Sequence, residues 1–279
     1  MKTIIKFSLT LSTFAIALFF GIIILSSCGG SAEKRENKDS LNSVQADSNK
    51  TDIKGIDYPV SSPLEMTKLL NNAGASYVLL SNPVKSIDKY MTEKKKAINL
   101  GVYGADLGYE STYNKTQETN QYLNNVKKLS EDLGISNVFD KKLLEKVEKY
   151  INSKDTLYNL FTSSFEKTYN QLQENGKGPV SALVLAGGWV EALYISSKLA
   201  ITSEKNEAIV KIVAEQKINL DKLMVAMKSY EDDPSVKGVI ELLGKVKAVY
   251  DKTNVGKLDS KQLDALAVAI DEVRTKLIE

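Results

Sequence analysis

Apolar residues recur every three to four positions along most of the chain after residue 57, which is the spacing that lines one face of an α-helix. The last segment shows this most clearly, because its apolar positions are 3, 4, 3 and 4 residues apart. These positions are Leu263, Leu266, Ile270, Val273 and Leu277. No run of strict apolar and polar alternation is long enough to predict a β-strand. The pattern predicts an all-α fold, a multi-helix bundle of about ten helices.

Glycine, proline and N-cap residues mark the ends of most of these segments. We expect one all-helical domain over residues 58–279, because the segments follow one another closely. The predicted helices cover residues 62–74, 92–113, 115–133, 140–151, 156–174, 179–201, 203–230, 234–251 and 259–278, with a further short helix that begins at Asn82 and Pro83.

The segment 179–201 differs from the others because it is apolar around most of its circumference. It contains two adjacent glycines, Gly187 and Gly188, the only tryptophan of the chain, Trp189, and one carboxylate, Glu191. A helix with so much apolar surface cannot hide it behind one stripe. We therefore expect this segment to be the central helix of the core.

The helix 92–113 resembles the central one, because it also mixes glycine, aromatic residues and one interior acid. Glycine inside a helix costs about 0.5 to 1 kcal/mol relative to alanine, so a gain elsewhere must offset it. Ridges of small residues let two helix backbones approach closely. The sequence predicts that these two helices cross at the core; the alternative is that the gaps hold a bound ligand. The two ridges are Gly101, Ala105 and Gly108, and Gly188, Ala192 and Ser196.

An internal repeat is a second inference from these two helices. Each is followed by three amphipathic segments, which suggests two four-helix units over residues 92–175 and 178–279. Any all-helical chain can be divided in this way, however, and the sequence alone leaves the repeat open.

Residues 1–27 have the features of a secretory signal: a basic start, a long apolar run and small residues at its end. The sequence Leu25-Ser26-Ser27-Cys28 closely resembles the lipobox of bacterial lipoproteins, in which the cysteine is acylated, with palmitate among its chains, and becomes the new N-terminus. An uncleaved membrane anchor is the alternative, since about 20 apolar residues can span a bilayer. The cysteine at the end of the run favours the lipoprotein.

Residues 28–57 are polar and contain few large apolar side chains, so they predict a flexible tether behind the acylated cysteine. Ser40 lies in an Asp-Ser-Leu sequence that resembles the short O-glycosylation sites of Bacteroidota, and Thr156 lies in a similar one.

Composition removes several classes of function. The chain has no histidine and one cysteine, so zinc, haem and Ser/His/Asp sites each lack an essential member, and we expect no metal and no cofactor. The 37 basic residues include Lys2 and Lys6 of the signal segment; the other 35 equal the 35 acidic residues. A neutral chain without a basic block does not predict nucleic-acid binding.

The candidate chemistry lies in the two glycine-bearing helices. Asp106 shares a helical face with Tyr103 and Tyr109, and Glu191 shares one with Tyr194. The simplest interpretation is that both acids are hydrogen-bonded inside the core, because a buried charge must be paired. The alternatives are a ligand pocket that includes Trp189, and a hydrolase in which the two acids line one open cleft.

The lipobox, the polar tether, NLGVYGADLGY, DLGI and LAGGWVEALY together resemble an uncharacterised family of helical lipoproteins from Bacteroidota. The resemblance covers most of residues 58–201 and less of the last three helices. It implies localisation and fold, and it assigns no functional residue.

These observations predict a lipid-anchored helical binding or scaffold module of the bacterial cell envelope. The outer membrane is the favoured location, but Gly29 after the cysteine does not decide between inner and outer membrane, and the sequence leaves the face open as well. The partner is a protein or a small molecule, and no enzyme activity is expected. The alternative is a small-ligand-binding lipoprotein with its pocket between the helices 92–113 and 179–201.

Overall fold

The computed structural model describes residues 60–135, 137–203 and 206–279, all of them within one compact unit, Lys54–Glu279. Over these ranges the chain forms nine α-helices, one 3₁₀-helix and no β-strand, which confirms the all-α prediction. The signal segment 1–27, Cys28, Ser40 and the tether lie outside the described residues, so these assignments stay predictions.

Every predicted helix is present, with ends within a few residues of those expected. The short helix at Asn82 and Pro83 is a 3₁₀-helix that begins at Val84. The elements are α1 (Pro63–Asn72), η1 (Val84–Lys89), α2 (Glu93–Thr112), α3 (Thr116–Asp132), α4 (Lys141–Lys149), α5 (Lys154–Glu174), α6 (Gly178–Thr202), α7 (Glu207–Lys228), α8 (Pro234–Tyr250) and α9 (Ser260–Ile278).

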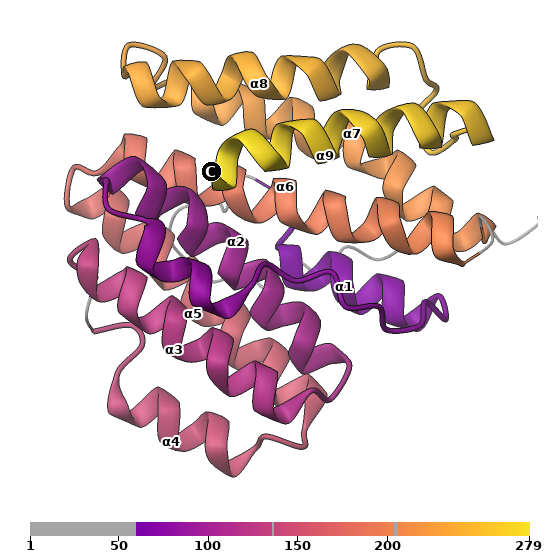
Figure 1. Ribbon diagram of the computed structural model, residues 1–279. Helices are drawn as coiled ribbons and strands as arrows, with labels where there is room; N and C mark the ends of the chain where they lie inside the picture. The colour runs from indigo at the N-terminus through magenta and orange to yellow at the C-terminus, as the bar shows by residue number, and fades with distance from the viewer. Residues whose placement is uncertain (1–59, 136, 204–205) are drawn as a thin grey trace, which may run out of the picture. The chain divides into compact units, whose positions relative to one another are not determined.

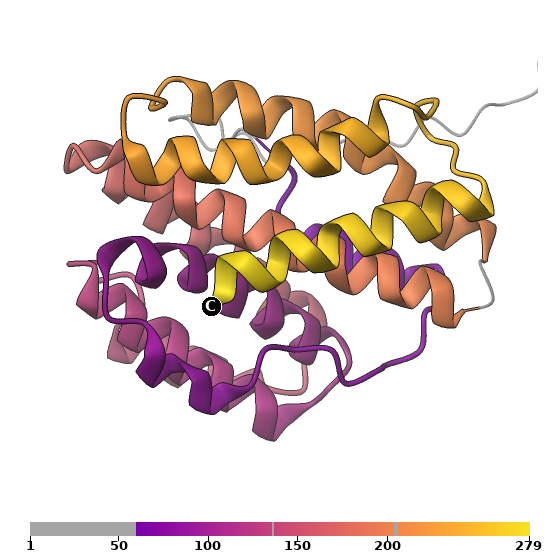
Figure 2. The same cartoon turned by 45° about the horizontal axis from the view of Figure 1, so that its top comes forward.

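Helix α6 is the centre of the bundle, as its apolar circumference predicts. It packs against α1, α2, α5, α7, α8 and α9. Helices α7 to α9 lie on one side of it and α2 to α5 on the other (Figures 1 and 2). Its length and composition would also suit a membrane span, but 94% of its apolar window is buried inside the bundle. We therefore interpret α6 as a core helix.

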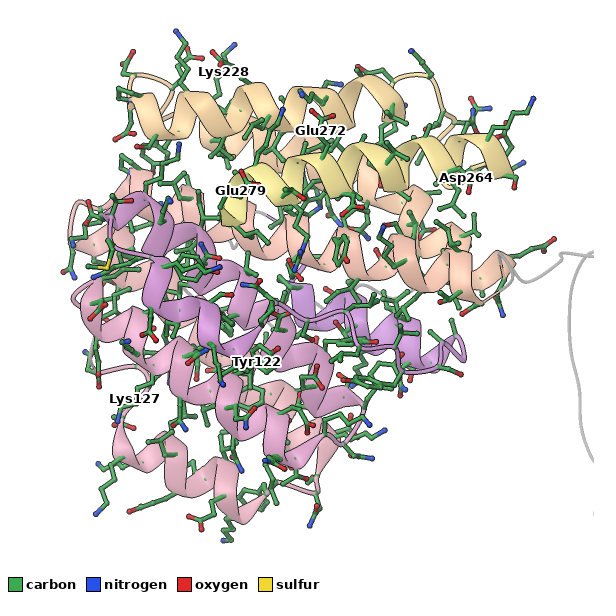
Figure 3. The ribbon with its side chains drawn as sticks, viewed as in Figure 1. Tyr122, Lys127, Lys228, Asp264, Glu272 and Glu279 are labelled. Carbon is green, nitrogen blue, oxygen red and sulfur yellow. The ribbon has the colours of Figure 1, made fainter. Side chains whose placement is uncertain are left out.

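The other long helices are amphipathic and turn one apolar face to the core. In α9 the five residues spaced 3, 4, 3 and 4 apart are all buried, as their spacing predicts. Charged side chains lie on the outward faces, as Lys228 on α7 and Asp264 and Glu272 on α9 show (Figure 3). Burial of these apolar faces is the main source of the bundle's stability.

Helices α2 and α6 cross with their backbones in contact, which confirms the predicted crossing. A Cβ atom on Gly187 would overlap the carbonyl oxygen of Ile98 and lie 2.9 Å from its carbonyl carbon. A Cβ atom on Gly101 would overlap the carbonyl oxygen of Val184 and lie 2.5 Å from the Gly188 nitrogen. Glycine is therefore required at both positions, because any side chain would push the two central helices apart.

One member of the predicted ridge on α2 has a different neighbour. A Cβ atom on Gly108 would meet the side chain of Leu64 on α1, 2.7 Å from Cγ, so this glycine admits α1 rather than α6. Beside the crossing a cavity of about 10 Å³ remains. That is room for one water molecule at most. It is lined by Pro63, Leu64, Gly101, Gly104, Phe165, Val184 and Gly188.

The two halves of the bundle are alike in part. In the first half α2 packs against α3 and α5, and in the second α6 packs against α7 and α9. The third helices differ: α8 contacts α6, α7 and α9, whereas α4 packs mainly against α5. Helix α4 is also the shorter of the two, with 9 residues against 17. The repeat over residues 92–175 and 178–279 thus stays a prediction, and α4 is where the halves diverge.

Candidate functional site

Residues 75–83 link α1 to η1 and run in an extended path beside α2; we call them the strap (Figure 2). The backbone of the strap is bonded by side chains of α2, of its C-cap residue Tyr113 and of α3, in place of a neighbouring strand. Tyr113 donates to the carbonyl of Ala75 at 2.8 Å, and Tyr103 donates to that of Pro83 at 2.9 Å. The strap is therefore held in a defined position by side-chain hydrogen bonds to its backbone.

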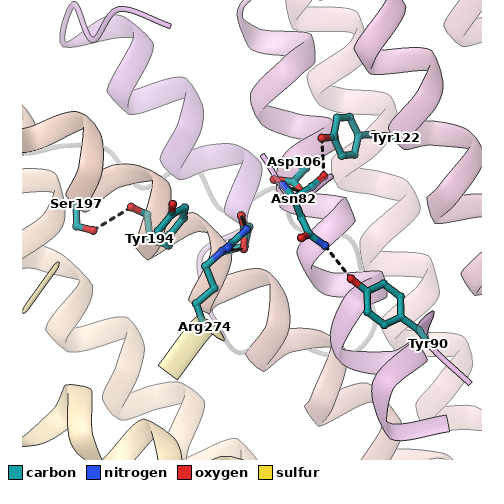
Figure 4. Close-up of polar contacts among 8 residues, drawn as sticks. Asn82, Tyr90, Asp106, Tyr122, Tyr194, Ser197 and Arg274 are labelled. Atoms are coloured by element: carbon teal, nitrogen blue, oxygen red, sulfur yellow. Dashed lines mark hydrogen bonds and ion pairs between the residues drawn. The ribbon is translucent and has the colours of Figure 1, made fainter. Parts of the chain in front are cut away.

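Between these two tyrosines, Tyr109 bonds both backbone groups of Val78. Its hydroxyl donates to the carbonyl at 2.8 Å and accepts from the amide N–H at 3.0 Å. From α3, Tyr122 donates to the carbonyl of Asn82 at 2.7 Å (Figure 4). The aromatic face predicted on α2 thus holds the strap.

Asp106 belongs to the same set of contacts. Its Oδ2 accepts the backbone N–H of Asn82 at 3.1 Å, and the Asn82 side chain donates to Tyr90 Oη at 2.9 Å (Figure 4). Asp106 is 0% exposed. Its Oδ1 receives no donor from the described residues, and its carboxyl lies within hydrogen-bonding reach of the Glu191 carboxyl. The fold therefore brings together the two acids singled out in the sequence.

Glu191 forms a bidentate ion pair with Arg274 of α9. Arg274 Nε donates to Oε2 at 2.6 Å, and a terminal nitrogen donates to Oε1 at 2.8 Å. The guanidinium carbon also lies 4.2 Å from the ring centre of Tyr194, in cation–π geometry. The pair is buried, with 0% of the Glu191 side chain and 11% of the Arg274 side chain exposed. It joins α6 to α9 by the strongest kind of side-chain hydrogen bond.

The carboxyls of Asp106 and Glu191 and the guanidinium of Arg274 lie together, so one of the two carboxyls must carry a proton if the cluster is to be neutral. Burial raises the pKa of Asp106 well above its usual value, and the nearby Glu191 raises it further. Burial also raises the pKa of Glu191, but the contact with Arg274 opposes this effect. We infer that Asp106 is protonated and donates to an ionised Glu191, because this arrangement leaves the buried cluster with no net charge.

A proton on Asp106 would make the stability of the fold depend on pH. A carboxyl whose pKa is higher in the folded state than its unfolded value of about 3.9 stabilises the fold below that value, and the contribution is lost as pH rises through the folded pKa. Asp106→Asn keeps the shape and the hydrogen bonds of the protonated acid without its titration. We expect thermal unfolding between about pH 5 and 9 to show a smaller loss of stability with pH in this variant than in the wild type. Equal slopes would place the proton elsewhere.

Glu110, which the sequence analysis did not single out, is a third buried carboxyl and, after Asp106, the second that contacts the strap. Its Oε1 accepts from Ser81 Oγ at 2.6 Å and from the Tyr77 hydroxyl at 3.4 Å. Burial raises its pKa. It therefore extends the same role as Asp106 along α2.

Five of the six residues proposed for a ligand site have one of two structural tasks, and the sixth, Trp189, has neither. Tyr103, Asp106 and Tyr109 hold the strap, and Glu191 and Tyr194 hold Arg274. Trp189 is 1% exposed, and its indole N–H has no partner among the described residues. The cavity described above, beside the contacts between α2 and α6, has a volume of about 10 Å³, which is far below the 300 to 1,000 Å³ typical of ligand sites.

An open site lies elsewhere, between α4 and α5. This α4–α5 groove has a volume of about 870 Å³. The α5 wall runs from Thr156 to Glu174, which is about 27 Å at 1.5 Å per residue. The groove is lined by Asn137, Val138, Asp140, Lys142, Leu143, Lys146, Thr156, Asn159, Leu160, Ser163, Ser164, Lys167, Asn170, Gln171 and Glu174.

Most polar side chains that line the groove form no hydrogen bond or ion pair with other described residues. Three lysines reach it, Lys142 and Lys146 from α4 and Lys167 from α5, and over the described chain none of them forms an ion pair. The side-chain amides of Asn159 and Asn170 likewise have no hydrogen-bond partner there. These groups are exposed or half-buried donors that a ligand can reach.

No family model, no curated protein and no solved structure matches this chain. The resemblance to helical lipoproteins of Bacteroidota therefore stays a prediction that rests on the sequence motifs.

Proposed function

We propose that this chain is a lipid-anchored helical binding module of the bacterial cell envelope, and that the α4–α5 groove is its binding site. The observation that carries the proposal is the contrast between two polar regions. The carboxyls of Asp106, Glu110 and Glu191 are 0% exposed and bonded within the fold. The groove instead presents polar side chains that the fold does not use.

This contrast weighs against the two sequence-based alternatives. A hydrolase would need Asp106 and Glu191 to face a cleft that admits substrate and water, and both are sealed inside the bundle. A ligand between α2 and α6 would have to separate backbones that touch at Gly101 and Gly187. Binding in the α4–α5 groove requires neither exposure of the two buried acids nor separation of α2 from α6.

Anchoring follows from the sequence of the N-terminal segment. An acylated Cys28 would carry several acyl chains, and these together hold a protein stably on a membrane. The helical body, described from Val60 onward, would stand away from the bilayer at the end of the tether 28–57. We propose the outer membrane as its location.

Replacement of the cysteine tests the anchor. The full-length Cys28→Ser variant is expected to remain unprocessed and to incorporate no labelled palmitate, because serine cannot form the thioether on which lipoprotein processing depends. Mass spectrometry of the N-terminus and labelling with an alkyne-bearing fatty acid measure both effects. A variant that is cleaved and labelled like the wild type would exclude lipid anchoring at this residue.

A further inference from the structure

We propose that the α4–α5 groove binds an acidic oligosaccharide, a chain of sugars that carries carboxylates. The inference rests on the proposed function and adds the chemical class of the partner. The side chains that line the groove decide which ligands it can bind.

The charges of the groove favour an anion. The lining contains three lysines, Lys142, Lys146 and Lys167, and two acids, Asp140 and Glu174. Asp140 is already engaged as the N-cap of α4, where its Oδ1 accepts the Leu143 N–H at 2.9 Å. Lysine binds carboxylate as a point charge, without the fixed fork of arginine. The cations therefore suit carboxylates that are spread along a chain.

The uncharged polar groups favour a ligand rich in hydroxyls. The amides of Asn159, Asn170 and Gln171 each offer both donors and an acceptor, and Ser163 adds a hydroxyl. Sugar hydroxyls offer the same combination from the ligand side. The α5 wall carries such groups from Thr156 to Glu174, so the groove suits a chain better than a single small molecule.

Other polymers fit this lining less well. Peptides are commonly bound at a sheet edge, in an apolar groove or on aromatic side chains, and the groove offers only Val138, Leu143 and Leu160 as apolar contacts. Single-stranded nucleic acid stacks its bases on aromatic residues, and none lines the groove. Lipid chains would also require a larger apolar lining. The lining of the groove can form hydrogen bonds with hydroxyls and ion pairs with carboxylates.

Two tetrasaccharides test the proposal on the full chain purified in detergent. Tetragalacturonate carries four carboxylates, and maltotetraose is an uncharged chain of the same number of sugars. By isothermal titration we expect saturable binding of tetragalacturonate that weakens as salt is added, and binding of maltotetraose that is at least about tenfold weaker.

Matched lysine variants locate the site. Lys142→Gln with Lys146→Gln removes two charges from the groove and is expected to weaken tetragalacturonate binding about tenfold. Lys141→Gln with Lys149→Gln removes two charges from the same helix outside the groove and is expected to leave binding nearly unchanged. Because all four lysines are exposed, both variants should fold.

The outcomes separate the ligand class from the proposed function. Equal loss of binding in both double variants, or no binding of tetragalacturonate, would overturn the acidic oligosaccharide. If maltotetraose binds as tightly as tetragalacturonate and Asn170→Ala weakens both, the acidic class is overturned while the groove remains the binding site. Lipid anchoring is measured separately at Cys28 and is untouched by any of these results.

Discussion

Gly187→Ala is expected to lower the free energy of unfolding by about 3 kcal/mol, although it adds one methyl group and a better helix former. The new Cβ atom would overlap the carbonyl oxygen of Ile98 on the facing helix. That oxygen is part of a helix backbone, so no side chain can rotate to make room. Helices α2 and α6 must move apart, and this loosens the most central contact of the bundle.

Two glycines serve as controls in the same measurement. Gly244 lies inside α8, and apart from its chain neighbours and the backbone of its own helix no atom lies within 4 Å of the position that a Cβ atom would take there, so Gly244→Ala should stabilise the protein by about 0.5 to 1 kcal/mol. Gly108→Ala would meet Leu64, 2.7 Å from its Cγ and 3.5 Å from its Cα, and should cost less than Gly187→Ala because the atom in closest contact belongs to a side chain. Urea unfolding followed by the fluorescence of Trp189 gives all three values. A Gly187→Ala protein as stable as Gly244→Ala would refute the backbone contact.

The helices could be predicted because each of them carries its own signal. In α9 the spacing of five apolar residues gives the face, and Asp259 gives the start, where its side chain accepts from the Gln262 N–H at 2.8 Å. The central place of α6 followed in the same way from its composition. These signals are local, so a single sequence contains them.

Neighbours across the fold are harder to predict, because spacing gives a face and not what covers it. The sequence indicated that Glu191 must be paired, yet its partner, Arg274, lies 83 residues away. A usable signal existed: Arg274 is the only arginine after residue 35, and it lies four residues after Ile270 on the buried side of its helix. An arginine there predicts a buried acid as its partner.

The strap and the groove could not be predicted for different reasons. Residues 75–83 have no periodicity, because their backbone is bonded by side chains such as Tyr109 and Asp106 and not by a regular ladder. The groove forms because α4 packs mainly against α5 and not against the central helices. A helical pattern in the sequence predicts a helix but not its position in the bundle. From the sequence alone, the polar face of α5 predicts an ordinary solvent-exposed surface, because nothing in its pattern shows that α4 lies opposite it.

Arg274→Met is expected to cost about 3 to 5 kcal/mol at pH 8, the range found when one partner of a buried ion pair is removed. Methionine replaces the apolar stem but leaves Glu191 ionised, 0% exposed and beside Asp106. Glu191 then lacks the cation that opposes the effect of burial on its pKa, so it should take up a proton more readily. The cost should therefore be smaller at pH 5 than at pH 8.

Two comparisons separate this effect from a simple loss of charge. Lys128→Met breaks an ion pair with Asp88 whose side chains are 53% and 78% exposed, and should change stability little at either pH. Adding Glu191→Gln to Arg274→Met removes the stranded carboxylate and should recover part of the lost stability, most of all at pH 8. Thermal unfolding of the wild type and these three variants at both pH values measures the differences. If Arg274→Met melts like Lys128→Met, the bidentate pair contributes no more than a surface contact, and the charge balance inferred for Asp106, Glu191 and Arg274 is wrong.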